Sequence, residues 1–485
     1  MEKKRNLTGK EKAAYGLGAV GKDMVYMLSA SYVLYYFQDI LGVSAVAMGI
    51  ILLGARIFDA FNDPIMGVIV AKTKTRWGKF RPWLIIGTST NAVVLFIMFA
   101  CPPSLDGAGL VAYAAVTYIL WGVTYTMMDI PFWSMIPAFT KGGKEREGLT
   151  TLARSCAGVG SAIVTIVTMM FVQKLGSIFA AANANSYDIE RVGFKWFSLI
   201  IAVLFVIFIV ITCITVKEKS TVDMQTAKVK DMFKALVQND QAMTAVITIV
   251  LINCAMYITS NLLIYFFKYD LGGANWYKDY TLFNTFAGAI QILAMMLLFP
   301  LLRKFFSSIK IFFIGIAMSI IGYLSLLVIA TTGVPNVYIL FIPGFFIMAA
   351  SGMNNVLITV FLANTVDYGE LKNHRRDESV IFSMQTFVVK LSSGVAAFIA
   401  SICLQIFALS ADKANETQKA VDFSLNVAAS SKFGLRMTMT LIPIAGLILA
   451  FIWFKKKYIL TDQKIEEITD QIIVQREADA ISATK

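Results

Sequence analysis

The chain has 485 residues, of which 57% are hydrophobic and 15% are charged, and its mean hydropathy is +0.69. This composition predicts a polytopic membrane protein and excludes a soluble globular domain. The apolar runs are continuous and do not alternate with period two, which excludes a transmembrane β-barrel.

The net charge of +12 comes from basic residues that gather in alternate loops. They lie at 3–12, 72–81, 141–146, 217–234, 303–310, 372–376 and 455–457, whereas 39–43, 103–108 and 332–335 carry no Lys or Arg. This is the positive-inside pattern, and it predicts that both termini are cytoplasmic. The basic excess is therefore topological and does not indicate nucleic-acid binding. The five cysteines are scattered in or beside apolar runs, and His374 is the single histidine, so neither a disulfide framework nor a His-based metal cluster is expected.

Twelve apolar runs are long enough to cross a bilayer, because a spanning helix needs about 20 residues. They lie at 14–38, 44–70, 82–102, 109–137, 152–173, 196–216, 241–267, 279–302, 311–331, 336–363, 380–408 and 435–454. We expect an all-α protein with a six-helix bundle at 1–216, a cytoplasmic middle loop at 217–240 and a second six-helix bundle at 241–456. This layout is typical of transporters whose bundles rock around a midplane site. Isoleucines at helical spacing predict a short cytoplasmic helix in the tail, 457–485.

Ionisable residues inside the spans are concentrated in the first half of the chain, beginning with Lys22 and Asp23 in span one. Span two adds Arg56, Asp59 and Asp63, span four adds Asp129, and Arg154 begins span five. Spans seven to nine are expected to hold no charge, which leaves Lys390 in span eleven as the deep charge of the second half. We therefore expect the N-terminal bundle to carry most of the ligand chemistry and the other bundle to close over it.

Span two contains the densest polar group. Asp59 and Asp63 are four residues apart and share one helix face, with Arg56 one turn earlier and Asn62 beside them. A carboxylate at the centre of a bilayer costs roughly 2.5–3.5 kcal/mol on insertion scales, so such residues indicate function. Carboxylate and carbonyl oxygens are the ligands that hard cations prefer, which favours a site for a small cation such as Na⁺. The alternative is a structural ion pair, in which Arg56 neutralises Asp59 and holds helices together; the two interpretations are compatible.

Span four places Tyr125, Asp129 and Trp133 above one another on a single helix face. A carboxylate accepts hydrogen bonds from sugar hydroxyls, and an aromatic ring packs on the apolar face of a pyranose. Asp23 would supply a second acceptor, with donors from Lys22 or Arg154. The alternative for the two aromatic residues is packing or the interfacial belt. Thr126, one turn before Asp129, would offer its hydroxyl to a cation held by span two.

Span eleven contains Gln385, Thr386 and Lys390. A lone lysine in a span is expected to pair with a carboxylate across the bundle interface or to face a wet cavity, and in either case it would couple the two halves. Snorkelling of Lys390 to the surface is the alternative. The short basic loop that ends at Trp83 is interpreted as topological charge or as a cytoplasmic latch.

Five stretches, 21–23, 56–67, 76–83, 125–133 and 367–390, resemble the glycoside–pentoside–hexuronide:cation symporters of the major facilitator superfamily. The similarity runs along nearly the whole chain. It implies a major facilitator fold of twelve helices in two bundles. It also implies symport of a galactoside such as melibiose, or of a related glycoside, driven by Na⁺, H⁺ or Li⁺ through alternating access.

The resemblance also implies site residues. Those matching its cation site are Asp59, Asn62, Asp63 and Thr126. Those matching its sugar-facing or coupling positions are Lys22, Asp23, Tyr125, Asp129, Trp133, Arg154, Gln385, Thr386 and Lys390. The melibiose-carrying members have a tryptophan in span ten where this chain has Asn355, which removes a ring from the pocket wall and leaves the exact sugar open.

Other functions stay open at this point. Within transport, the alternatives are a carrier of a glucuronide, a pentoside or a lysolipid. A membrane enzyme is disfavoured because the short loops hold no catalytic cluster, and a sugar sensor because the tail is too small for a signalling domain. We expect a multi-pass protein of the plasma (inner) membrane, acting as a monomer on a sugar and a monovalent cation, with no organic cofactor and no nucleic-acid partner.

Overall fold

The computed structural model describes residues 7–139, 143–218, 234, 237–333, 336–373, 378–409 and 422–483. The regular secondary structure of this part consists of helices, and the β-bridge found in it is an isolated pair between Thr75 and Gly78. Eleven helices of this part are long and apolar enough to cross a membrane. The all-α fold predicted from the sequence is confirmed. Most of the predicted middle loop and the basic residues at 374–377 lie outside the described part.

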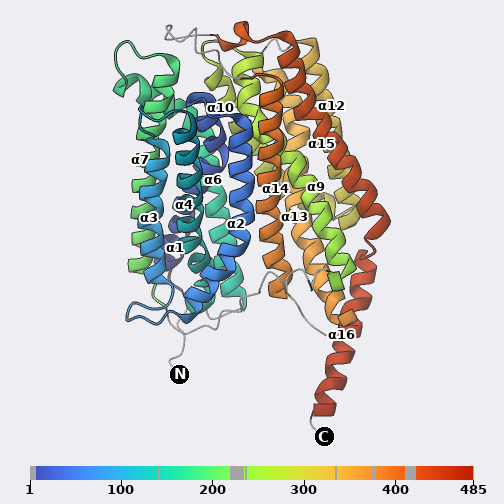
Figure 1. Ribbon diagram of the computed structural model, residues 1–485. Coiled ribbons are helices and arrows are strands. Elements are labelled where there is room, and N and C mark those ends of the chain that lie inside the picture. The colour runs from blue at the N-terminus through green and yellow to red at the C-terminus, as the bar shows by residue number, and fades with distance from the viewer. Residues whose placement is uncertain are drawn as a thin grey trace. The chain divides into compact units, whose positions relative to one another are not determined.

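The first compact unit comprises Met1–Thr226, Phe267–Leu282 and Ser401–Ala428. Its helices are α1 (Gly9–Tyr35), η1 (Tyr36–Ile40), α2 (Ala45–Lys72), α3 (Arg81–Phe99), α4 (Gly107–Ser134), α5 (Ile136–Phe139), α6 (Gly143–Phe179) and α7 (Ser186–Thr215). Within this unit α1 packs against α6 and α7, and α4 packs against both α2 and α3 (Figure 1). Within this unit the side chains of Lys22 on α1 and of Arg56 and Asp59 on α2 are buried.

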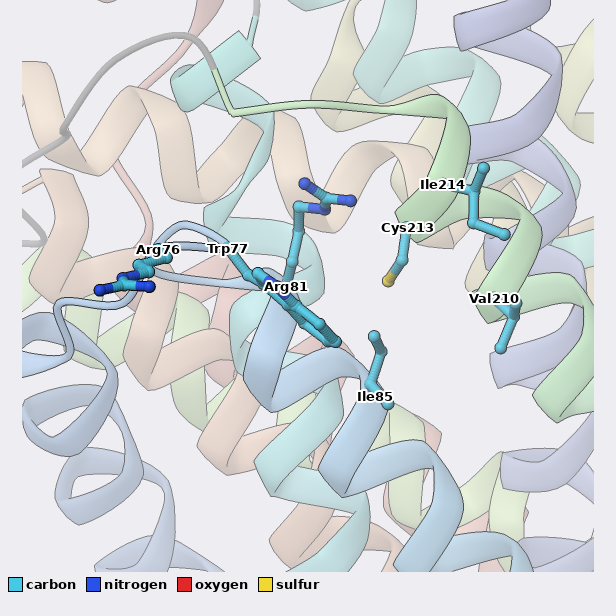
Figure 2. Close-up of a pocket in the computed structure, with 7 residues that line it drawn as sticks. All are labelled: Arg76, Trp77, Arg81, Ile85, Val210, Cys213 and Ile214. Atoms are coloured by element: carbon cyan, nitrogen blue, oxygen red, sulfur yellow. The ribbon is translucent and has the colours of Figure 1, made fainter.

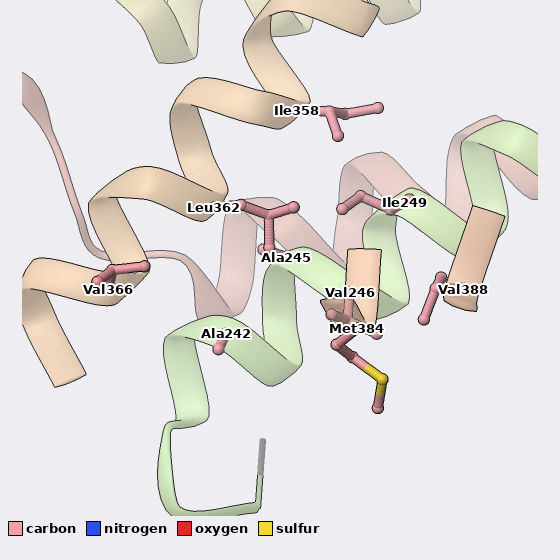
Figure 3. Close-up of a cluster of buried hydrophobic side chains, with 9 residues drawn as sticks. All are labelled: Ala242, Ala245, Val246, Ile249, Ile358, Leu362, Val366, Met384 and Val388. Atoms are coloured by element: carbon pink, nitrogen blue, oxygen red, sulfur yellow. The ribbon is translucent and has the colours of Figure 1, made fainter. Parts of the chain in front are cut away.

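The second compact unit comprises Ala227–Phe266, Phe283–Ala400 and Ala429–Lys485. The helices from the second half of the chain are α9 (Asp240–Tyr265), η2 (Phe266–Leu271), α10 (Trp276–Leu293), η3 (Ala294–Leu298), α11 (Phe299–Arg303), α12 (Ser308–Thr332), η4 (Val337–Leu340), α13 (Phe341–Asn373), α14 (Glu378–Ile406), η6 (Phe423–Asn426), α15 (Ala429–Lys457) and α16 (Asp462–Ala483). A buried apolar cluster joins α9, α13 and α14; it includes Ile249, Leu362 and Val388 (Figure 3).

Several helix bounds differ from the predicted spans. Span one corresponds to α1 and η1, and α1 is absent from the eleven apolar helices because Lys22 and Asp23 lie in its middle. The sixth span begins earlier, at Ser186, and the seventh continues through the π-helix η2 to Leu271. Both extensions bring charged residues into helices that looked apolar. The predicted division of the chain at 217–240 stays a prediction.

The predicted tail helix is present as α16. Its Ile468 and Ile472 are buried, and α16 packs against α13 within the second unit. The linker before it is also anchored, because Tyr458 is buried against Phe361 and Phe454. Burial raises the pKa of the Tyr458 phenol, which therefore stays neutral in this apolar setting. The tail is thus anchored to the second unit through Tyr458, Ile468 and Ile472.

Candidate functional site

Lys22 is the centre of a polar cluster between α1 and α4. Its buried ammonium lies 2.8 Å from Asp23 Oδ1 and 2.8 Å from Asp129 Oδ1, and it donates a 3.0 Å hydrogen bond to the Tyr125 hydroxyl. The Asp23 and Asp129 side chains are 20% and 26% exposed, whereas the Lys22 side chain is only 4% exposed. The lysine therefore holds two carboxylates at positions that a ligand can reach.

Trp133 and Arg154 extend this cluster. The Trp133 Nε1 atom donates a 3.1 Å hydrogen bond to Asp129 Oδ1, and the Arg154 Cζ atom lies 4.0 Å from the centroid of the indole ring. The face shared by Tyr125, Asp129 and Trp133 on α4 is thus confirmed as a local arrangement. Carboxylates, cations and an aromatic ring in one place suit a neutral ligand with many hydroxyls and an apolar face.

A second cluster lies between α2 and α4. Arg56 forms a buried ion pair with Asp59, with 3.1 Å between Nη1 and Oδ2. Thr126 donates a 2.9 Å hydrogen bond to Asp63 Oδ1 across the two helices. Asn62 is beside them, and its Nδ2 atom is buried without a hydrogen-bond partner in the described part of the chain. An orphaned buried amide is costly, so this is a place where the polar groups are not mutually satisfied.

Gly122 on α4 is a member of this second cluster that the sequence reasoning did not name. A Cβ atom at this position would lie 3.1 Å from Asp59 Oδ1, so the missing side chain leaves room for that carboxylate. The signal was available, because Gly122 precedes Thr126 by four residues and therefore shares its helix face.

The donor set of the second cluster suits a hard monovalent cation. It consists of the carboxylates of Asp59 and Asp63, the amide of Asn62 and the hydroxyl of Thr126, all of which supply oxygen ligands. Among the described residues there is no group of three or more His, Cys, Asp or Glu that could hold a metal ion. Arg56 supplies the positive charge next to Asp59.

The remaining predicted residues lie in the second unit. Gln385 and Lys390 are half-buried on α14, and the side chain of Thr386 is outside the described part of the chain. Asn355 is exposed on α13. Of the nine residues predicted to face a sugar, the structure brings together the six of the first unit.

Comparisons with known proteins bear on this geometry. The chain matches the family described as "MFS/sugar transport protein" over residues 14–462. It belongs to this family of major facilitator sugar transporters. The predicted family is therefore confirmed, and the protein is a multi-pass membrane transporter and not an enzyme.

Individual relatives agree with this assignment. The raffinose carrier protein of Pediococcus pentosaceus is 28% identical over 94% of this chain and 70% of its own length. The isoprimeverose transporter of Lactiplantibacillus pentosus is 28% identical over 90% of this chain and 86% of its own length. The putative glycoside/cation symporter YagG of Escherichia coli K12 is 26% identical over 97% of this chain and 96% of its own length.

Solved structures support the fold. A bacterial homologue of the human lysosomal transporter Spinster, inward-facing and unoccupied, aligns with a TM-score of 0.63 at 11% identity, over 95% of this chain and 97% of that chain. The nucleoside transporter NupG aligns with a TM-score of 0.59 at 11% identity, over 92% of this chain and 98% of that chain. At this identity the likeness shows the major facilitator fold alone.

The transporter contains a third cluster, which corrects one expectation. Spans seven to nine were expected to hold no charge, but Lys268 lies in the extended seventh span and is fully buried. Its ammonium lies 2.7 Å from Asp39 Oδ2 and 3.6 Å from Glu190 Oε2, and the three side chains are 0%, 0% and 1% exposed. The expectation was wrong because η2 continues the helix beyond its predicted end at 267.

Every member of this third cluster has several partners. Tyr35 donates a 2.6 Å hydrogen bond to Glu190, Tyr269 donates one to Asp39, and Gln173 donates one of 2.9 Å to Glu190. These contacts connect the segment Phe267–Leu282 to α1, η1 and α7 within the first unit. The buried charges are thereby paired and hydrogen-bonded, as burial of charge requires.

Proposed function

We propose that the transporter is a cation-coupled symporter of a glycoside. The observation that carries this proposal is the placement of two polar clusters on one helix. α4 supplies Tyr125, Asp129 and Trp133 to the cluster around Lys22, and Gly122 and Thr126 to the cluster around Asp59. A shift of α4 on binding at one cluster therefore changes the other.

The Lys22 cluster is the proposed sugar site. Asp23 and Asp129 accept hydrogen bonds from ligand hydroxyls, while Lys22 and Arg154 act as donors. The Trp133 ring packs against the apolar face of a pyranose. Because Lys22 and Trp133 already bond to Asp129, that carboxylate is oriented before the sugar arrives. Gln385, Thr386 and Lys390 of α14 stay predicted sugar-facing or coupling residues.

The Asp59 cluster is the proposed cation site, with Asp59, Asn62, Asp63 and Thr126 as ligands for Na⁺, H⁺ or Li⁺. Binding of a cation offsets the repulsion between the Asp59 and Asp63 carboxylates. The Asn62 amide then reorients so that its oxygen contacts the cation. If cation and sugar favour the same closed state, each raises the affinity for the other. One charge moving through 100 mV supplies roughly 2.3 kcal/mol, and tenfold accumulation costs about 1.4 kcal/mol, so voltage alone sustains roughly fiftyfold accumulation.

Alternating access gives the Lys268 cluster a role in this mechanism. Phe267–Leu282 comes from the second half of the chain but packs in the first unit, and the Lys268 ion pairs hold it there. In an alternating-access cycle this segment would then move with the first unit. We place the protein as a monomer in the plasma (inner) membrane, with both termini cytoplasmic.

The substrate class rests on the chemistry of the site and on the relatives. The raffinose, isoprimeverose and glycoside carriers support a galactoside such as melibiose, or a related glycoside. A glucuronide or pentoside is the alternative within the same site, and a lysolipid is a weaker one because the Lys22 cluster is rich in charged groups.

Uptake into membrane vesicles tests the proposal. Radiolabelled melibiose, lactose and methyl-glucuronide are supplied while Na⁺, Li⁺ and H⁺ gradients are imposed one at a time. The proposal predicts accumulation of at least one neutral galactoside that stops when one cation gradient is removed. Uptake that no cation gradient changes would refute symport, and uptake of the glucuronide alone would move the substrate to the alternative class.

A further inference from the structure

A pocket of about 240 Å³ lies where α3 begins and α7 ends (Figure 2). Arg76, Trp77 and Arg81 line one side of it, from the loop after α2 and the first residue of α3. The rest is lined from α3 and the last turns of α7 by the side chains of Ile85, Val210, Cys213 and Ile214. The pocket is therefore basic at one end and apolar at the other.

The two ends of the pocket lie at different depths of the spans. The apolar spans run over Arg81–Phe99 and Ser186–Thr215, so Arg81 marks the beginning of one span, and Ile85 and Val210 lie about one turn inside the two spans, whereas Ile214 lies at the end of its span. Ile214 is 68% exposed and Trp77 is 64% exposed. An exposed isoleucine within a span faces lipid, and an exposed tryptophan at its end is the side chain preferred at the headgroup level.

The basic end carries charge that is available to a ligand. Five cationic residues lie between Lys72 and Arg81. Among the described residues no carboxylate forms an ion pair with Arg76 or Arg81, and the buried Arg81 Nε atom has no hydrogen-bond partner. Glu218 is close, but its carboxylate accepts the backbone N–H groups of Lys79, Phe80 and Arg81 at 2.7–3.0 Å.

These backbone contacts fix the loop that carries Arg76 and Trp77. Gly78 has φ of +107°, and a Cβ atom there would lie 2.4 Å from the Glu218 carboxylate, so only glycine fits. Trp83 Nε1 donates a 2.8 Å hydrogen bond to Thr73 Oγ1 at the start of the loop. The basic end of the pocket is thus held in place before any ligand binds.

We propose that this pocket binds an anionic phospholipid. The lipid phosphate binds at the guanidinium group of Arg81 and Arg76 adds positive charge from the loop, while Trp77 packs at the glycerol level and an acyl chain follows Ile85, Val210 and Ile214. A free anion would gain nothing from the apolar end. A zwitterionic headgroup would bring its ammonium against the cationic loop, which favours a net negative headgroup such as phosphatidylglycerol.

Native mass spectrometry of the purified full-length protein tests this site. Detergent-solubilised protein is incubated with dioleoyl phosphatidylglycerol or dioleoyl phosphatidylcholine, and the bound lipid is counted. We expect selective retention of phosphatidylglycerol, reduced roughly tenfold or more in the double variant Arg76→Gln with Arg81→Gln, since each basic residue near a membrane surface contributes about 1 kcal/mol. The matched control, Lys455→Gln with Lys456→Gln, removes two charges at the end of α15 and should retain the lipid.

A photoreactive phosphatidylglycerol locates the contact without any variant. We expect crosslinked peptides that contain residues 76–85 or 210–214. Equal retention of the two lipids, equal loss in both double variants, or crosslinks confined to other spans would overturn the proposal. Displacement of the lipid by millimolar inorganic phosphate would overturn it as well, because the pocket would then be a phosphate site. None of these outcomes depends on the transported substrate, so the symport proposal is tested separately.

Discussion

At the residue scale, the polar groups of the first unit differ in how completely they are paired. Lys22 contacts two carboxylates and a phenol, whereas the Asn62 amide nitrogen is buried with no partner in the described part of the chain. Fully paired groups are positioned in advance, and an unsatisfied group is ready to reorient around a ligand. The contrast supports the proposal of a sugar site whose polar groups are in place before the ligand binds. It also supports a cation site whose polar groups become fully paired only when the cation binds.

Gly122 gives the first prediction at this scale. Gly122→Ala puts a methyl group 3.1 Å from the position of Asp59 Oδ1, so the carboxylate must shift by a few tenths of an ångström. We expect the cation concentration for half-maximal uptake to rise several-fold, with little change in the amount of protein in the membrane. Vesicle uptake at graded Na⁺, Li⁺ and H⁺ concentrations measures the shift.

The control is Gly54→Ala on α2, where a Cβ atom meets nothing within 4 Å. Both substitutions raise helix propensity equally, so the comparison isolates the contact with Asp59. An unchanged cation dependence in Gly122→Ala would show that Asp59 does not bind the cation at this place.

Lys268 gives the second prediction. Lys268→Met leaves Asp39 and Glu190 buried without their cation, and breaking a buried ion pair in this way costs roughly 3–5 kcal/mol. We expect a large loss of thermal stability, measured by unfolding of the purified protein. Lys278→Met, at an exposed lysine of the same segment, should change stability little, and equal stability of the two variants would contradict the structural role of the cluster.

At the element scale, α16 is held to the second unit by apolar packing more than by charge. Tyr458 stacks on Phe454 with ring centroids 4.3 Å apart, whereas the ion pair between Arg303 and Asp462 is 43% and 36% exposed. Exposed ion pairs contribute little because water and salt screen them. The buried ring and the isoleucines of α16 therefore anchor the tail.

A matched pair of variants tests this ranking. Tyr458→Ala removes a buried ring, and the comparable Phe→Ala change costs about 3–5 kcal/mol, so the unfolding temperature should fall clearly. Asp462→Asn removes only the exposed ion pair and should cost at most about 1 kcal/mol. Limited proteolysis of the tail reports the same difference. A larger fall in the unfolding temperature for Asp462→Asn than for Tyr458→Ala would contradict the larger contribution of apolar packing.

The sequence predicted those elements whose signal is local. The stripe of Tyr125, Asp129 and Trp133 follows from spacing along one helix, and so does the pair Asp59 and Asp63. The Lys268 cluster was missed because its residues are far apart in the chain, Lys268 being 229 residues from Asp39, and because two of its helices extend beyond the apolar runs. Hydropathy marks where a helix is apolar and does not mark where it ends.

At the scale of the whole molecule, family membership and local geometry answer different questions. The match over residues 14–462 establishes a major facilitator sugar transporter. The clusters on α1, α2 and α4 add a specific arrangement in which one helix contributes to both the proposed sugar site and the proposed cation site. We propose that α4 couples the two clusters. Uphill accumulation of sugar needs this coupling, whereas simple exchange of sugar does not.

The most direct measurement compares Asp59→Cys with the unchanged protein in vesicles, at equal amounts in the membrane, for accumulation and for sugar exchange at equal concentrations. In the proposed mechanism accumulation needs the cation, whereas exchange needs only the proposed sugar site. The account predicts that Asp59→Cys abolishes accumulation driven by a Na⁺, Li⁺ or H⁺ gradient while measurable exchange remains. Accumulation by Asp59→Cys equal to that of the unchanged protein would contradict it.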